Sequence, residues 1–171
     1  MIQLDTLFWE KMMPTINDTS DYVVLKLRHG GVILNVLKLH KLMYYIQAWH
    51  LAFNRGPFFP GRFQAWVHGP VNRELYDRYK DSKNMYSPVD LQDIQPGFNP
   101  SQTLADQERA HIDAVLEVYA NFTGDQLEEM THREEPWLQA RAGVAPSARS
   151  ENHLSEDVMQ KFYSARLPQQ A

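Results

Sequence analysis

The sequence predicts a mainly helical fold, a compact multi-helix bundle around a long central helix with a short β-hairpin or extended element. Apolar residues recur at three- and four-residue spacing along most of the chain, and only one short segment alternates with a period of two. A hydrophobic content of 43%, with 8 Phe, 8 Tyr and 4 Trp, supplies a core. The length of 171 residues suits one domain of the usual ~150 residues and excludes a second full-size catalytic domain.

The first part of the chain predicts two helices. Apolar spacing over residues 2–13 indicates a short amphipathic helix that Pro14 ends. Asn17 or Asp18 is expected to cap a second helix, because these residues accept hydrogen bonds from a helix start. That helix is expected to end at the glycines of 30–31, because glycine readily adopts the backbone conformation that terminates a helix.

The third predicted helix is the longest, from about 36 to 54. Asn35 is suited to cap it, and Gly56 with Pro57 ends it. Apolar residues occupy nearly its whole circumference, which is typical of a helix buried at the centre of a bundle.

Residues 57–70 show a different hydrophobic periodicity. Phe63, Ala65 and Val67 alternate with other side chains, which indicates a short strand or extended loop. Pro70 is then expected at the first position of a helix that runs to about residue 80.

A long, proline-containing connection over 81–102 leads to the second half, with a short strand expected around 89–94. Thr123 and Gln126 have capping-box spacing, and Ser155 is suited to cap the last helix. The expected later segments are helices at 103–122, 123–130 and 136–141, a linker at 143–150, and a C-terminal helix from Ser155.

Composition excludes several function classes. The chain has no cysteine, which rules out a disulfide scaffold, a thiolate zinc site and a cysteine nucleophile. No window approaches 18 consecutive apolar residues, and the N-terminus has no leader pattern, so we expect a soluble cytoplasmic protein with no membrane partner. A net charge of −4 makes nucleic acid an unfavoured partner. No glycine-rich phosphate loop is present, so no cofactor is expected.

The charge is divided unevenly along the chain. Residues 1–83 carry 11 basic and 7 acidic side chains, whereas 84–171 carry 6 and 14. Residues 22–73 contain seven basic residues and no acid. Either the acidic half packs against this segment and neutralises it, or part of the segment is an exposed basic surface that attracts an acidic partner.

No pattern of residues in the sequence requires the protein to be an enzyme. The seven histidines include no metal-binding helix pair, so no metal site is expected. The segment His132 to Glu135 is the best local candidate for a metal site, although a structural role explains it better. A metal-dependent hydrolase or nuclease using His68, His132 and Glu135 remains an alternative, provided that these groups converge on a metal.

The long helix carries a stripe of Lys38, Lys41, Tyr45 and Trp49, which helical geometry places on one side. In one interpretation the rings close the core and the ammonium groups extend outward. In the other, the stripe is a partner-binding strip, because aromatic and cationic residues together often anchor interfaces.

Three segments in order resemble a known family. The segment LKLHKLMYYIQAWH at 37–50 is similar to the "LKLQKLLYYAQGW" helix of the Panacea antitoxin domain family, which includes the SocA-like antitoxins. The segment FQAWVHGPV at 63–71 resembles that family's "FEAWxyGPV". Thr131-His132, Pro136-Trp137 and Arg141 resemble its "TH…PW…AR". We expect a domain at 15–143, preceded by the amphipathic extension at 1–14 and followed by a linker and C-terminal helix at 144–171.

The resemblance implies a function without catalysis. Members of the family are antitoxins that neutralise, by direct protein contact, a toxin encoded nearby. Some SocA-like members act as proteolytic adaptors that deliver a toxin to an ATP-dependent AAA+ protease such as ClpXP, so a protease is a second candidate partner. A homo-oligomer is also compatible with the resemblance.

Two groups of residues carry site hypotheses. The motif residues are expected to be chiefly structural, because large rings and a Gly-Pro turn fix a loop against a small core; they are Trp66, His68, Gly69, Pro70, His132, Pro136 and Trp137. The candidate partner surface combines the long-helix stripe with arginines that flank the 56–61 loop and with a rival N-terminal site; its residues are Lys38, Lys41, Tyr45, Trp49, Arg55, Arg62, Phe8 and Trp9.

Overall fold

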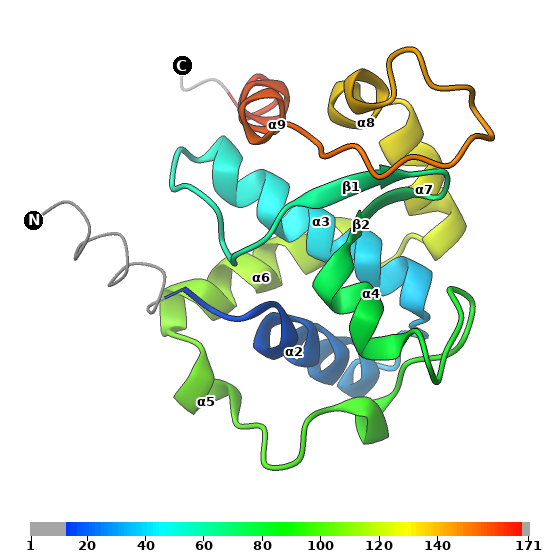
Figure 1. The fold of residues 1–171 in the computed structure, drawn as a ribbon. Coiled ribbons are helices and arrows are strands. Elements are labelled where there is room, and N and C mark those ends of the chain that lie inside the picture. Colours follow the sequence, from blue (N-terminus) through cyan, green and yellow to red (C-terminus); the bar gives the residue numbers. More distant parts are fainter. Residues whose placement is uncertain (1–12, 169–171) are drawn as a thin grey trace, which may run out of the picture.

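Helix α3 (Val36–Ala52) forms the axis of the molecule in the computed structural model, which describes residues 13–168. Helices from both halves of the chain and a two-stranded sheet surround it (Figure 1). The side chain of Asn35 accepts a hydrogen bond from the Lys38 amide at 2.8 Å, as expected for the cap. Every residue of α3 is buried except Trp49 and His50, which confirms a central buried helix.

Helix α2 (Ile16–His29) packs beside α3. Its cap is Thr15, whose hydroxyl accepts from the Asp18 amide at 3.0 Å. The expected caps Asn17 and Asp18 are wrong, because the helix begins earlier and both lie in its first turn. Gly30 ends the helix as expected.

The extended segment is one half of an antiparallel hairpin. Strand β1 (Phe63–Trp66) pairs with β2 (Gly69–Asn72), with Ala65 opposite Pro70. The expected helix start at Pro70 is wrong, because this residue belongs to β2. Helix α4 (Arg73–Tyr79) begins after Asn72, whose side chain caps it.

The connection after α4 contains no named strand within the described residues. A 3₁₀ turn, η1 (Leu91–Asp93), replaces the strand expected at 89–94, because the Asp90 and Asp93 side chains cap it reciprocally. The buried carboxylate of Asp21 in α2 fixes the connection, since it accepts from Arg78 at 2.6 Å and from Gln95 at 2.7 Å.

The helix expected at 103–122 is present as a single shorter helix, and a separate short helix precedes it. Helix α5 (Pro100–Thr103) ends at Leu104, and α6 (Asp106–Tyr119) begins after Ala105. Leu104 and Ala105 adopt extended conformations, and the Glu108 side chain accepts from the Ala105 amide at 2.7 Å, so a new helix start forms there.

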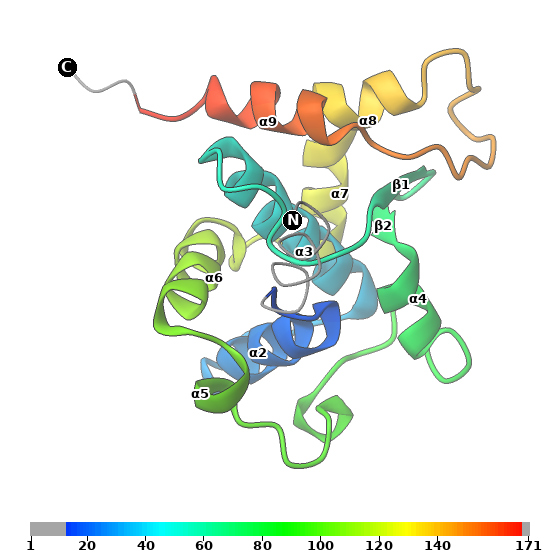
Figure 2. The same cartoon turned by 60° about the vertical axis from the view of Figure 1, so that its left-hand side comes forward.

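Three helices complete the fold. Helix α7 (Gly124–His132) has the predicted capping box of Thr123 and Gln126, and α8 (Glu135–Ala140) follows it directly. Helix α9 (Glu156–Ser164), capped by Ser155 as predicted, lies across α3 and beside α8 (Figure 2).

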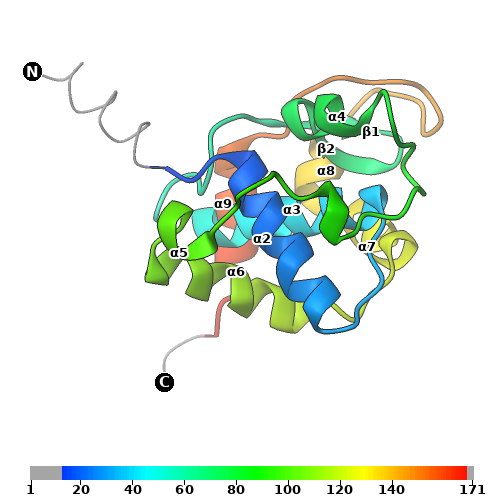
Figure 3. The same ribbon diagram turned by 90° about the horizontal axis from the view of Figure 1, so that it is seen from below.

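On the opposite side of α3, helices α2, α5 and α6 form the lower layer (Figure 3). No helix in the described part of the chain is long and apolar enough to cross a membrane. The amphipathic helix expected at 2–13 lies outside the described residues.

Candidate protein-binding site

The family-like segments meet around the buried amine of Lys41. This side chain is fully buried in α3, and its Nζ donates a hydrogen bond to the Pro70 carbonyl at 3.0 Å. Gly69 has a φ of +94° and lies directly on the lysine stem, where an added Cβ would be 2.7 Å from Cε. Burial lowers the pKa of Lys41 to about 7, and the carboxylate of Glu128 opposes that lowering.

Two histidines flank Glu128. Nδ1 of His68 lies 2.9 Å from Glu128 Oε1, and Nε2 of His132 lies 3.9 Å from the same oxygen. The His132 ring stacks on Trp137 with a centroid distance of 4.1 Å. Burial lowers the pKa of His132, which favours a neutral imidazole at neutral pH.

The tryptophan and arginine of the third segment attach to the hairpin. Trp137 Nε1 donates to the Trp66 carbonyl at 2.9 Å. The buried Arg141 donates to the Ala65 carbonyl at 2.9 Å and to the Ala148 carbonyl at 2.7 Å. These two side chains therefore hold backbone segments in place through their hydrogen bonds.

The alternative of a metal-dependent enzyme gains no support from this arrangement. Within residues 13–168, no group of three or more His, Asp or Glu side chains could hold a metal ion. His68 and His132 gather on Glu128, whereas Glu135 is exposed at the start of α8.

The lysine and tyrosine stripe does not face solvent. Lys38, Lys41 and Tyr45 are buried, with exposed fractions of 6%, 0% and 0%. The Tyr45 ring closes the core, as in the first interpretation, but the Lys41 ammonium does not extend outward, because neighbouring elements enclose α3. Lys38 lines a surface groove. Tyr45 donates to Glu134 at 2.5 Å and stacks on Tyr119 at 4.0 Å.

Of the other candidate partner residues, Arg55 and Arg62 are exposed as expected. Arg55 lies over the Phe53 ring, and Arg62 donates to the Leu154 carbonyl at 3.0 Å. Trp49 is half-buried, and its indole donates to the Tyr119 hydroxyl at 2.8 Å. Phe8 and Trp9 lie outside the described residues.

The acidic half pairs with part of the basic segment. Ion pairs cross between the halves and involve three of its seven cations; they are Lys26 with Asp113, Arg28 with Asp90, and Arg73 with Glu151. The interpretation in which the two halves pack together is therefore correct for these residues.

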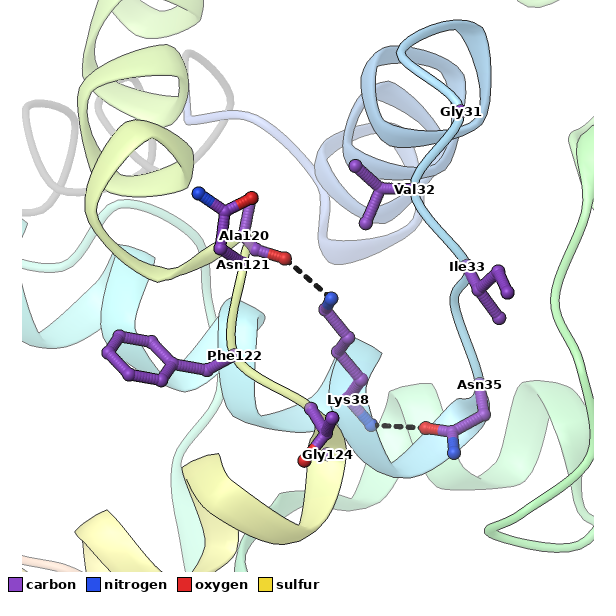
Figure 4. A pocket seen from close by; sticks show the side chains of 10 residues that line it. Gly31, Val32, Ile33, Asn35, Lys38, Ala120, Asn121, Phe122 and Gly124 are labelled. Atoms are coloured by element: carbon purple, nitrogen blue, oxygen red, sulfur yellow. Dashed lines mark hydrogen bonds between the residues drawn. The ribbon is translucent and has the colours of Figure 1, made fainter.

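A surface groove lies between the 31–35 loop and the 120–124 loop, where α3 and α7 begin (Figure 4). Its volume is about 500 Å³. Lys38 lies within it and donates from Nζ to the Ala120 carbonyl at 2.6 Å. We call this feature the Lys38 groove; it is lined by Gly31, Val32, Ile33, Asn35, Lys38, Ala120, Asn121, Phe122, Thr123 and Gly124.

Sequence reasoning singled out Lys38 but missed its surroundings. Ile33, at 81% exposure, is a large apolar residue in the turn after a double glycine, and Phe122 follows the end of α6. The local sequence carried no signal of this exposure, because Leu34, the residue after Ile33, is buried. Joining the two loops needed the fold, because they are about ninety residues apart in the sequence.

The arrangement defines a small helical domain whose most distinctive polar residues fix a hairpin and two short helices against a central helix. The chain belongs to the antitoxin SocA-like, Panacea domain family, whose model matches residues 39–138. No curated protein and no solved structure matches the chain. Membership of this family supports an antitoxin-type role with a toxin as the partner.

Proposed function

We propose that this chain is the antitoxin of a toxin–antitoxin pair and that it neutralises its toxin in the cytoplasm by direct protein binding. The observation that carries the proposal is that the family-like residues make structural contacts within the fold. Lys41 and Trp137 bond to backbone carbonyls of the hairpin, and Arg141 bonds to β1 and the loop beyond α8. These residues support a scaffold, and family membership supplies the expected partner.

Surface features favour binding as the mode of action. The Lys38 groove has large exposed apolar side chains at its edges, namely Ile33 at 81% and Phe122 at 37%. Apolar side chains that are exposed together are typical of protein contact sites. A binding antitoxin needs such a surface and needs no turnover.

Co-expression with the product of the neighbouring gene tests this proposal. The intact chain should restore growth, and a tag on either protein should recover a complex. A frameshifted gene for the chain is the control, since it keeps the transcript and removes the protein. Rescue that persists in a variant with no measurable association would contradict neutralisation by binding.

The same strains separate direct inhibition from delivery to a protease. Direct inhibition predicts rescue with the toxin level unchanged, in cells that lack the AAA+ protease as well as in cells that have it. A toxin level that falls only when the protease is present would support the adaptor function instead.

A further inference from the structure

We propose that the Lys38 groove holds an acidic and apolar segment of the partner protein, with a partner carboxylate at the Lys38 amine and a large apolar side chain against Ile33 or Phe122. This inference rests on the proposed function and locates its binding site.

The charge of Lys38 lacks a counterion within the described residues. The side chain is 6% exposed, yet no carboxylate of residues 13–168 lies within 4.0 Å of its Nζ. The Lys38 Nζ donates to one backbone carbonyl, that of Ala120, although an ammonium group has three donors. Burial lowers the pKa of Lys38, with no carboxylate opposing it. A carboxylate from outside would supply the missing charge.

Several basic side chains, unlike Lys38, already have an acidic partner within the fold. Arg73, Lys80 and Lys83 each lie within 3.5 Å of an acid of this chain. An acidic partner at those positions would have to displace an existing pair. At Lys38 it would add a charge-assisted hydrogen bond without breaking a pair.

The apolar part of the proposed contact lies on both sides of the lysine. Figure 4 shows Ile33 on one loop and Phe122 on the other, with the Lys38 amine between the loops. Val118, at 62% exposure, lies four residues before Phe122 near the end of α6. Covering these side chains would remove apolar area from water, which favours association.

The groove is already shaped without a partner. Gly124 at the start of α7 packs so closely on the start of α3 that an added Cβ would lie 3.1 Å from both Asn35 Oδ1 and the Lys38 amide nitrogen. This contact holds the two loops in fixed positions. A preformed groove reduces the ordering cost of binding, and about 500 Å³ accommodates a few side chains.

Binding kinetics of the complex with the neighbouring gene product test the proposal. Ile33→Glu places a like charge beside the expected carboxylate and should raise Kd by about ten-fold or more. Tyr86→Glu is the matched control, because Tyr86 is also an exposed apolar residue, at 61%, and does not line the groove. That variant should change Kd by less than about two-fold.

Lys38→Met tests the charge directly, because it keeps the apolar stem and removes the amine. It should raise Kd by about ten-fold and weaken the salt dependence of association. Should this variant fail to fold, Ile33→Glu and Phe122→Ser still decide the question, since both replace exposed side chains. Each variant is checked by its thermal melting curve.

The outcomes separate this inference from the function on which it rests. If the intact chain neither binds nor rescues, the proposed function fails and the inference fails with it. If the intact chain binds but Ile33→Glu behaves like Tyr86→Glu, the groove assignment alone is overturned. It is also overturned if Ile33→Glu only converts a dimer of this chain to a monomer, with toxin binding unchanged.

Discussion

The Lys41 amine is neutral in a large fraction of folded molecules near neutral pH, because burial lowers its pKa to about 7. The unfolded chain keeps the usual lysine pKa of about 10.4. Between these values the unfolded state binds the extra proton, so stability must rise as pH rises. This dependence follows from enclosing a lysine under the start of β2, at Gly69 and Pro70.

We expect the free energy of unfolding to increase from pH 7 to pH 9.5, with a contribution from Lys41 approaching about 1.4 kcal/mol per pH unit. Lys41→Met should reduce that slope, because methionine does not titrate. Urea unfolding of both proteins across this range measures the effect. Equal slopes in the two proteins would contradict a neutral, buried Lys41.

The two tryptophans joined by a hydrogen bond should differ in their contribution to stability. Trp137 is 8% exposed, whereas Trp66 is half-buried with its ring against Tyr76. Trp137→Ala should destabilise by about 3–5 kcal/mol, and Trp66→Ala by about 1–3 kcal/mol, because less area is lost from the core. Denaturant unfolding checks this order, and a reversed order would refute it.

A single glycine, the first residue of β2, fits the hairpin to α3. Gly69 has a positive φ, and a Cβ there would meet Lys41 Cε at 2.7 Å and Thr131 Oγ1 at 2.8 Å. Gly97 also has a positive φ but has no atom within 4 Å of such a Cβ. Substituting each of these two glycines therefore separates the cost of backbone strain from the cost of steric contact.

Gly97→Ala should cost about 1–2 kcal/mol from its backbone conformation alone. Gly69→Ala should cost that amount and about 1–3 kcal/mol more from overpacking. Thermal or urea unfolding of both variants gives the difference. Equal losses would mean that the hairpin does not press on Lys41 as closely as the structure indicates.

Helix α9 contributes a buried tyrosine to the face of α3. Tyr163 is fully buried, and its hydroxyl donates to the Tyr44 hydroxyl at 3.1 Å. Tyr163→Ala should destabilise by about 3–5 kcal/mol, whereas Lys161→Ala, on the exposed side of the same helix, should have little effect. Unfolding curves that match for the two variants would show that α9 is dispensable.

The helix periodicity was sufficient to predict α3 as the central helix, because its apolar residues surround the whole axis. It could not show that Lys38 and Lys41 are buried, since local pattern treats a lysine as a surface residue. Their burial depends on carbonyls at Ala120 and Pro70, which come from distant segments. Pro70 lies in a strand because its segment pairs with β1, where Ala65 is opposite it. The local sequence could not show this pairing, because a proline is also typical of the first turn of a helix.

The two oppositely charged halves of the chain are joined by ion pairs within the fold, and Arg28 with Asp90 is one of them. The half-buried Arg78 pairs with the buried Asp21 and fixes the long connection. Lys38 remains as a buried cation beside exposed apolar residues. The charge asymmetry of the sequence therefore indicated that the two halves pack together, and a binding role for Lys38 stays a prediction.

We propose that this chain acts by binding and not by turnover. Titrating a fixed concentration of the toxin with the chain, and measuring the remaining toxin activity, tests this most directly. We expect a break at a fixed stoichiometric ratio, with no further loss of activity over time. Toxin activity should recover fully after the complex is separated under denaturing conditions and the toxin is refolded. Progressive inactivation by substoichiometric amounts of the chain would instead indicate catalysis and overturn the binding mode of action.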